Sequence, residues 1–283
     1  NVTGVVQNSA TSQLTLSGAN TYTGATTVSA GTLKGGAANV FGGAGSTSAL
    51  VMNGGTLDMG GYSQAFGSLT GTGNITSSAT GTLTLTVGYN NTSPSAYSGV
   101  ISNGSATSVG LTKVGTGTLI LSGANTYTGA TTVSAGVLKG GAANVFGGAG
   151  STSALVMNGG TLDMGGYSQA FGSLTGTGNI TSSATGTLTL TVGYNNTSPS
   201  AYSGVISNGS ATSVSLTKVG SGTTILSGTN TFSGAVTISA GTLSVNTVAN
   251  SGSNSSLGTG ASTPEISIGA TGVLMYTGTG DNT

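Results

Sequence analysis

Catalysis or metal binding in this chain would depend on very few ionisable side chains. The 283 residues include four Lys, four acidic residues and no His, Cys or Trp. Without His, a Ser-His-Asp or Cys-His arrangement cannot be assembled, and without Cys there is no thiolate metal site. The charged residues are Lys34, Lys113, Lys139, Lys218, Asp58, Asp163, Glu265 and Asp281.

The carboxylates are poorly placed for acid–base chemistry. Asp58 and Asp163 occupy the same position in two copies of a repeat, which puts them ~24 Å apart if one copy spans five coils of strand. Glycosidase carboxylate pairs need roughly 5–9.5 Å. A Ser-Lys dyad is formally possible, but each Lys falls in a repeated strand position. We therefore expect no enzyme, and no catalytic, cofactor-binding or metal-binding residues.

Glycine-rich stretches offer little more. Phe41–Ser48 reads FGGAGSTS, but no Lys or helix follows, as a phosphate-binding loop requires. No copy of the Asp-bearing calcium nonapeptide occurs, and GTGDNT at the end is expected to be a turn. With four Lys and zero net charge, nucleic acid is not an expected partner. No run of 18 apolar residues predicts a membrane span.

The chain is instead dominated by a repeat of about 105 residues. Residues 14–109 recur as residues 119–214, with changes only from Thr15 to Ile120 and from Thr32 to Val137. A third copy drifts after Val214 and no longer matches past Val245. The blocks are 14–118, 119–223 and 224–283, the last partial and divergent. Near-identical copying favours a spacer over an active site.

Local patterns inside the block predict short strands. TLTLTVG places Leu83, Leu85 and Val87 on one face, and glycine recurs too often for helices. A Gly-Thr-Leu beat of roughly 20–26 residues suggests one coil per beat of a parallel β-solenoid, with about five coils in a block. The beat leucines are Leu33, Leu57, Leu83, Leu119, Leu138, Leu162 and Leu188.

Two further expectations follow from the beat. Lys34 and Asp58 each come directly after a beat leucine, so they should stack as an exposed axial pair, as should Lys139 and Asp163. The LSGANTYTG motif carries Asn20, Asn125 and Asn230, followed by Tyr22, Tyr127 and Phe232. An aromatic, amide-bearing surface could stack on sugars, but a corner Asn beside a packed ring is the interpretation we favour.

These residues also carry a family resemblance. LTKVGTGTLILSGANTYTGATTVSAGVL, residues Leu111–Leu138, resembles the autotransporter-associated β-strand repeat of large bacterial surface proteins. The resemblance extends from about Leu14 to Val245. It implies a right-handed parallel β-helix on the bacterial outer cell surface or outside the cell. The chain starts at Asn1 without a signal peptide, so we expect one continuous solenoid, residues 1–283, from a longer protein.

The expected function is a non-catalytic stalk or fibre segment that acts as a spacer or builds a surface layer or filament. Its partners would be neighbouring repeats and, through lateral self-association, other copies. The alternative is an adhesin that binds glycans or neighbouring cells through the solenoid faces or the loops Asn90–Ser95 and Asn195–Ser200. A polysaccharide-cleaving β-helix enzyme would need clustered carboxylates.

Overall fold

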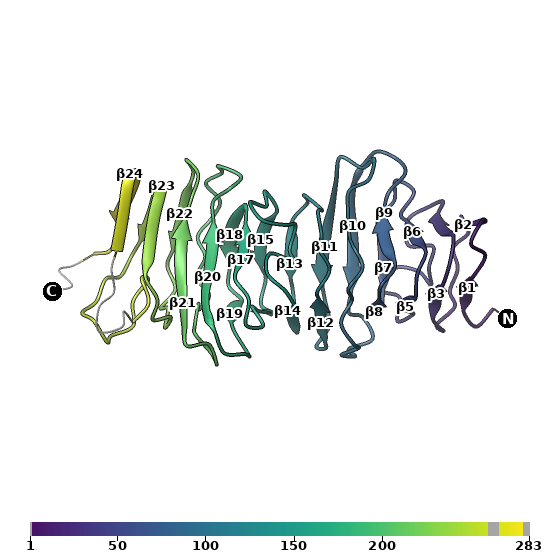
Figure 1. Ribbon diagram of the computed structural model, residues 1–283, viewed down its shortest axis with the longest axis horizontal. Helices are drawn as coiled ribbons and strands as arrows, with labels where there is room; N and C mark the ends of the chain where they lie inside the picture. Colours follow the sequence, from purple (N-terminus) through teal and green to yellow (C-terminus); the bar gives the residue numbers. More distant parts are fainter. Residues whose placement is uncertain (1, 260–265, 280–283) are drawn as a thin grey trace.

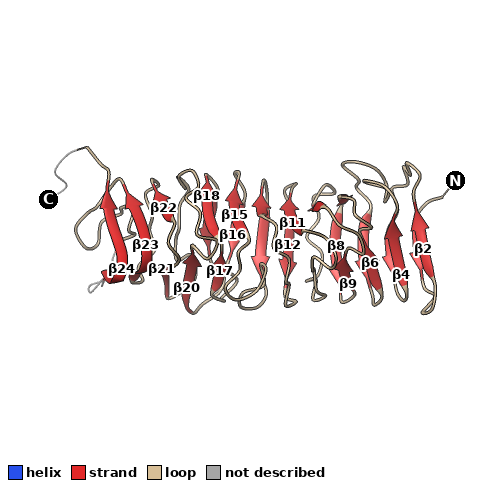
Figure 2. Cartoon of the chain, turned by 90° about the horizontal axis from the view of Figure 1, so that it is seen from above, coloured by secondary structure: helices blue, strands red, loops and turns tan. Residues whose placement is uncertain are grey.

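The chain folds into one elongated rod of stacked coils, seen from the side in Figure 1 and from above in Figure 2. This computed structural model describes residues 2–259 and 266–279. Every pairing between the named strands is parallel, and strands follow one another along the long axis with the two termini at opposite ends. Within the described ranges no helix is long and apolar enough to cross a membrane. The expected all-β fold, a parallel β-helix, is confirmed.

Each coil passes in turn along three faces of the rod, which we call faces 1, 2 and 3. Isolated bridges and corner hydrogen bonds join the shorter sheets into these continuous ladders. Face 1 contains β1 (Val5–Gln7), β3 (Thr26–Val28), β5 (Ala49–Met52), β8 (Ser68–Gly71), β12 (Thr118–Leu121), β14 (Val137–Gly140), β16 (Thr161–Asp163) and β19 (Asn179–Thr181).

The other two faces are built in the same way, and the last two strands bend round the corner between them. Face 2 contains β2 (Gln13–Leu16), β4 (Thr32–Gly35), β6 (Thr56–Asp58), β9 (Asn74–Thr76), β17 (Gln169–Phe171), β20 (Thr187–Val192) and β21 (Ser213–Lys218). Face 3 contains β7 (Gln64–Phe66), β10 (Thr82–Val87), β11 (Ser108–Lys113), β13 (Thr131–Val133), β15 (Ala154–Met157), β18 (Ser173–Gly176) and β22 (Thr223–Leu226). The strands shared by both are β23 (Val236–Val245) and β24 (Ile266–Tyr276).

The core is a thin column of inward side chains that stack from coil to coil. In β10 the inward Leu83, Leu85 and Val87 are buried and the intervening threonines are partly exposed, as the alternation predicts. The pairs Leu50 and Met52, on face 1, and Leu57 and Met59, at face 2, are also buried. Because successive strand side chains point to opposite sides, alternate residues are enough to fill a column one coil wide.

Glycine and asparagine turn the chain between faces. Gly60, just after β6, has φ of +65°, and a Cβ placed there would lie 1.9 Å from the carbonyl oxygen of Gly35 in the coil below. A side chain is therefore excluded twice, by backbone conformation and by the neighbouring coil. Asn39 and Asn91 also adopt positive φ, which Asn tolerates better than most residues.

The turn count makes the expected figure of about five coils in a block more exact. Starting from β4 on face 2, four complete turns lead through β6, β9 and Ile101 to Thr126. Two further passes, β13 on face 3 and β14 on face 1, complete the block. One block is thus four turns and two passes, one pass short of five turns.

The Gly-Thr-Leu beat marks a coil only in part. Leu33 pairs with Leu57, and Leu119, Leu138 and Leu162 pair in succession, as expected. Leu57, however, pairs next with Ile75, because the chain turns back onto face 2 after a short coil. The expectation that Leu83 continues the series was wrong, as was the same expectation for its equivalent Leu188: both leucines lie one face further on, in β10 and β20.

Candidate functional site

The two predicted charge pairs are present, one in each of the first two blocks. Lys34 and Asp58 are register partners between β4 and β6, and their Nζ and Oδ2 atoms are 3.4 Å apart. Lys139 and Asp163 repeat the arrangement between β14 and β16 at 3.5 Å. The first pair lies on face 2 and the second on face 1, so the two carboxylates belong to different faces.

The pair is less exposed than expected, because its carboxylate is part of a turn. Asp58 is 4% exposed, and its Oδ1 accepts hydrogen bonds from the backbone N–H groups of Gly60 and Ser78. Burial alone raises the pKa of Asp58, but the hydrogen bonds from Ser78 and Gly60 and the charge of Lys34 outweigh it, so the pKa lies below its ordinary value. A carboxylate with this low pKa and these donors serves the turn and is a poor general acid.

Two buried lysines are among the polar residues that sequence reasoning missed. Lys113 is the last residue of β11 on face 3 and is 1% exposed. Lys218 is the last residue of β21 on face 2 and is fully buried. The Nζ atom of Lys113 donates to the carbonyl oxygens of Val114, Gly115 and Ala135 at 2.6, 2.8 and 3.4 Å. These carbonyls match the three donors of an ammonium group. Alternation in SVGLTK gave the signal, since Lys113 shares the parity of the inward Leu111.

Burial has an electrostatic consequence for these lysines. It lowers the pKa of Lys113 to about 8 and also lowers that of Lys218. A depressed lysine pKa is a feature of some catalytic sites. Here the side chain is enclosed by backbone, and no carboxylate forms an ion pair with it among the described residues. The geometry is that of a cation closing a corner of the coil.

The asparagine of the LSGANTYTG motif joins three successive coils. Asn125 is fully buried; its Oδ1 accepts from the backbone N–H of Ile101 in the coil before, at 2.8 Å. Its Nδ2 donates to Gly123 in its own coil and to Val145 in the next. Tyr127 is also fully buried, with its hydroxyl on Thr131. Asn230 and Phe232 are likewise fully buried in the third copy. The geometry of the motif is thus that of a corner Asn beside a packed aromatic ring.

The two loops considered for adhesion are fastened to the solenoid. Asn90 donates to Ser68 in the coil before, and its Oδ1 accepts from Thr92 within the loop. Asn91 accepts from the backbone of Thr116 in the coil after, at 2.8 Å. The same bonds recur in the loop Asn195–Ser200. The amide oxygens of Asn90 and Asn91 and the amide nitrogen of Asn90 are therefore already hydrogen-bonded, within the loop or to neighbouring coils.

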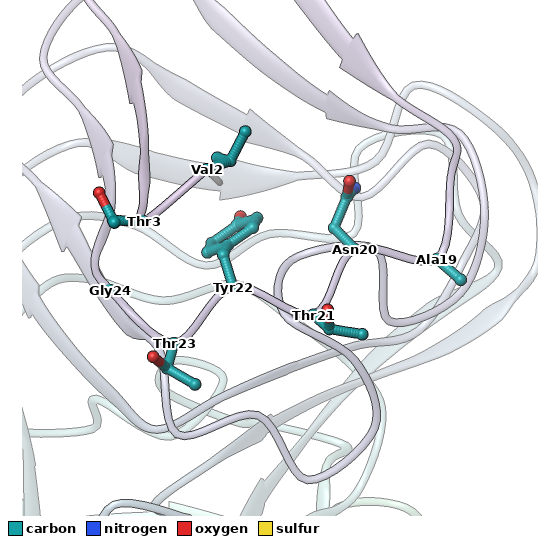
Figure 3. Close-up of a pocket in the computed structure, with 8 residues that line it drawn as sticks. All are labelled: Val2, Thr3, Ala19, Asn20, Thr21, Tyr22, Thr23 and Gly24. Carbon is teal, nitrogen blue, oxygen red and sulfur yellow. The ribbon is translucent and has the colours of Figure 1, made fainter.

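A hollow of about 680 Å³ lies at the N-terminal end of the rod (Figure 3). Asn20 and Tyr22 point into it from the first LSGANTYTG motif. In the second block the equivalent surface is covered by the coil that contains Ile101 and Asn103. The Asn103 side chain donates a hydrogen bond to the Thr128 hydroxyl and accepts one from the Thr128 backbone N–H. The hollow thus lies where, in the second block, the preceding coil packs.

The remaining candidates add no cluster of chemistry-bearing groups. Glu265 and Asp281, with most of the terminal GTGDNT stretch, lie outside the described residues. In the described ranges no three His, Cys, Asp or Glu side chains gather as a metal site would require. Phe41–Ser48 forms the corner between faces 3 and 1, with Gly42, Gly43 and Gly45 at positive φ. No buried side-chain N or O atom of the described residues lacks a hydrogen-bond partner.

These features define a repetitive parallel β-solenoid whose polar groups are used to hold its own coils together. Three segments of the chain match the model of the passenger-associated-transport-repeat family: residues 11–34, 111–139 and 216–245. The chain therefore carries three copies of this repeat, and the resemblance to autotransporter-associated repeats is confirmed. Searches of curated proteins and of solved structures found no match.

Proposed function

We propose that this chain is a non-catalytic structural segment of a bacterial surface or extracellular protein, and that it acts as a rigid spacer. One observation carries the proposal: the polar groups that could recognise or transform a ligand are hydrogen-bonded between successive coils. Asn125, Lys113 and the loop Asn90–Ser95 each connect neighbouring coils in this way. The passenger-associated repeats support the location at the cell surface.

The rod can be extended because of the way its coils stack. A solenoid's stability is close to a sum of coil and nearest-neighbour terms, so additional blocks extend the rod without changing its fold. Each strand-to-strand step adds ~4.8 Å. A neutral, evenly built rod supplies reach, which is the property a spacer needs. The adhesin function remains the alternative, because Tyr89 and Tyr194 are exposed beside the two loops.

The spacer function can be tested with the purified chain in two assays. The first measures the maximum dimension by small-angle X-ray scattering in variants with one block fewer or one block more. We expect the length to change by a constant step of ~22 Å for each block. A compact particle, or a length that does not follow the block number, would contradict the proposal.

The second assay asks whether the same chain binds or cleaves carbohydrate. A glycan array and a reducing-end assay on mixed polysaccharides serve as probes, with Tyr89→Ser/Tyr194→Ser and Asp58→Asn/Asp163→Asn as matched double variants. We expect no signal above background for any of the three proteins. Glycan binding lost in the tyrosine variant would establish the adhesin, and turnover lost in the aspartate variant would establish an enzyme.

A further inference from the structure

The surface of the rod does not repeat when its sequence repeats. Since one block is one pass short of five turns, every equivalent element moves back by one face in the next block. β4 lies on face 2 and its equivalent β14 on face 1, while β3 on face 1 becomes β13 on face 3. The local hydrogen bonds are nevertheless the same, so the three faces are interchangeable hosts for one sequence. Three blocks are needed to return to the same face.

The rotation distributes the exposed tyrosines around the rod. From β3 to β23 the exposed large hydrophobic side chains are four tyrosines, 37–44% exposed: Tyr62, Tyr89, Tyr167 and Tyr194. Each lies where the chain turns from one face to the next. Tyr89 is at the corner of faces 3 and 1, Tyr167 is at the corner of faces 1 and 2, and Tyr62 and Tyr194 are at the corner of faces 2 and 3. All three corners are occupied within two blocks.

The surroundings of these tyrosines carry almost no charge. Among the described residues, two of the four lysines are buried, and the other two are paired with the two aspartates. The described part of the surface therefore gives little electrostatic repulsion toward a second rod of the same composition. An exposed ring with a hydroxyl group makes apolar and hydrogen-bonded contacts together, which is why tyrosine is enriched in interfaces. The exposed Thr and Ser side chains nearby, such as Ser95 and Ser200, offer hydroxyl partners to such a ring.

We propose that the corner tyrosines are lateral contact points between copies of this chain, and that the one-face rotation directs these contacts to three sides of each rod. The partner is a second copy, because a neutral surface of tyrosine and hydroxyl side chains is complementary to itself. This inference rests on the proposed structural role and makes it more specific. Contacts in three directions build a bundle, whereas a flat layer needs contacts in one plane only.

The rotation is tested first, by spin-label distances in the full chain, which has no native cysteine. Ser95 and Ser200 are exposed equivalents, and they should lie ~30 Å apart, from ~22 Å along the axis and about one face across it. Thr177 is exposed at the same corner as Ser95, four turns away, so the control pair Ser95→Cys/Thr177→Cys should give ~19 Å. If block repeats did not rotate, Ser95 and Ser200 would be separated along the axis alone. A measured distance of ~22 Å for this pair, close to the ~19 Å of the control pair, would therefore overturn the rotation.

The lateral contacts are tested by sedimentation and negative-stain electron microscopy of the full chain. We expect bundles whose formation responds weakly to salt. The variant Y62S/Y89S/Y167S/Y194S should need at least about tenfold more protein to assemble. The variant Y62S/Y194S, which clears one corner, should still associate but form thinner assemblies. The variant with Tyr→Phe at all four positions is the control, because it keeps the aromatic rings and removes only the hydroxyl groups.

Three outcomes would overturn the contact proposal. They are a monomeric wild-type chain at every concentration and salt level, flat layers one rod thick, or bundles that the four-serine variant leaves unchanged. Each outcome is separate from the spacer test, because the length of a single rod does not depend on its lateral assembly. A fourth outcome, glycan-dependent assembly that the serine variant abolishes, would also overturn the proposal and would assign the tyrosines to an adhesin.

Discussion

Lys113 shows at the scale of one residue how the coil sets the chemistry of a side chain. The alternation of β11 directs it inward, where only backbone carbonyls are available to its ammonium group. Burial favours the neutral amine and lowers the pKa to about 8 from the ordinary value of 10.5. The carbonyl contacts satisfy the donors without a counter-charge. The residue therefore connects stability to pH between its lowered pKa and the ordinary one.

We predict that Lys113 makes the folded chain increasingly stable as pH rises from about 8 to about 10. In this window the unfolded chain still binds a proton at this lysine and the folded chain does not, so the free energy of unfolding increases with pH. Lys113→Met should remove its share of the increase, up to about 3 kcal/mol. Urea midpoints at pH 7 and pH 10 measure it. Lys34→Met, at a partly exposed position, is the control, and an equal pH response in both variants would contradict the prediction.

The motif asparagines provide a second comparison of two chemically identical residues. Asn125 bonds to the coil before it, its own coil and the next, whereas Asn20 bonds only to Gly18 and Val40. Asn125→Ala leaves buried backbone groups of Ile101 and Val145 without partners and should cost roughly 2–4 kcal/mol. Asn20→Ala should cost about 1 kcal/mol or less. Denaturant unfolding measures both, and equal costs would show that the coil-to-coil bonds do not matter.

At the scale of the strand and turn, the corners between faces determine the structure of a coil. Strands of three or four residues carry few hydrogen bonds each, and the turns between them decide where the next strand starts. Asp58 accepts from Gly60 in its own corner and from Ser78 in the corner above, so one carboxylate aligns two coils. Corners of this kind leave no room for a Cβ where adjacent backbones meet.

Gly60 is the position where this constraint is most severe. Its φ is positive, and a Cβ at this residue would lie 1.9 Å from the Gly35 carbonyl oxygen. We therefore predict that Gly60→Ala pushes the two coils apart. We expect a loss of at least about 2 kcal/mol and lower protection of β4 and β6 in hydrogen exchange. Gly18→Ala is the matched control, because a Cβ there meets no atom within 4 Å. A small effect at Gly60 would mean that the corner relaxes easily.

At the scale of the whole molecule, a sequence period and a structural period coexist without coinciding. Each block supplies the same inward column and the same corner bonds, so blocks can be added or removed in register. Because a block is one pass short of five turns, each added block places the elements that follow it one face further round the rod. A rod of many blocks would present its corners in a slow spiral, with the same composition on every side.

Excision of Lys34–Leu138 tests this relation directly. The new junction joins Leu33 to Lys139 and preserves the local sequence, so the product should fold with nearly unchanged thermal stability and lose ~22 Å of length. The loop Asn195–Ser200 should move to the corner of faces 3 and 1, which spin labels can detect. Removing Lys34–Thr128 instead breaks the repeat phase and should unfold or fray the neighbouring coils. An unfolded product of the in-phase excision would contradict nearest-neighbour additivity.

The sequence by itself determined the parallel β-solenoid, the inward leucines of β10 and the Lys34–Asp58 stack, because alternation and repetition act between near neighbours. Only the tertiary structure decided how many turns a block makes. Leu57 pairs with Ile75 and Ile75 pairs with Ile101, so one coil is much shorter than the next. Corners absorb different numbers of residues while hydrogen bonding fixes the spacing between coils. Counting along the chain therefore cannot give the angle through which a block turns, and that angle sets the direction in which each exposed tyrosine faces.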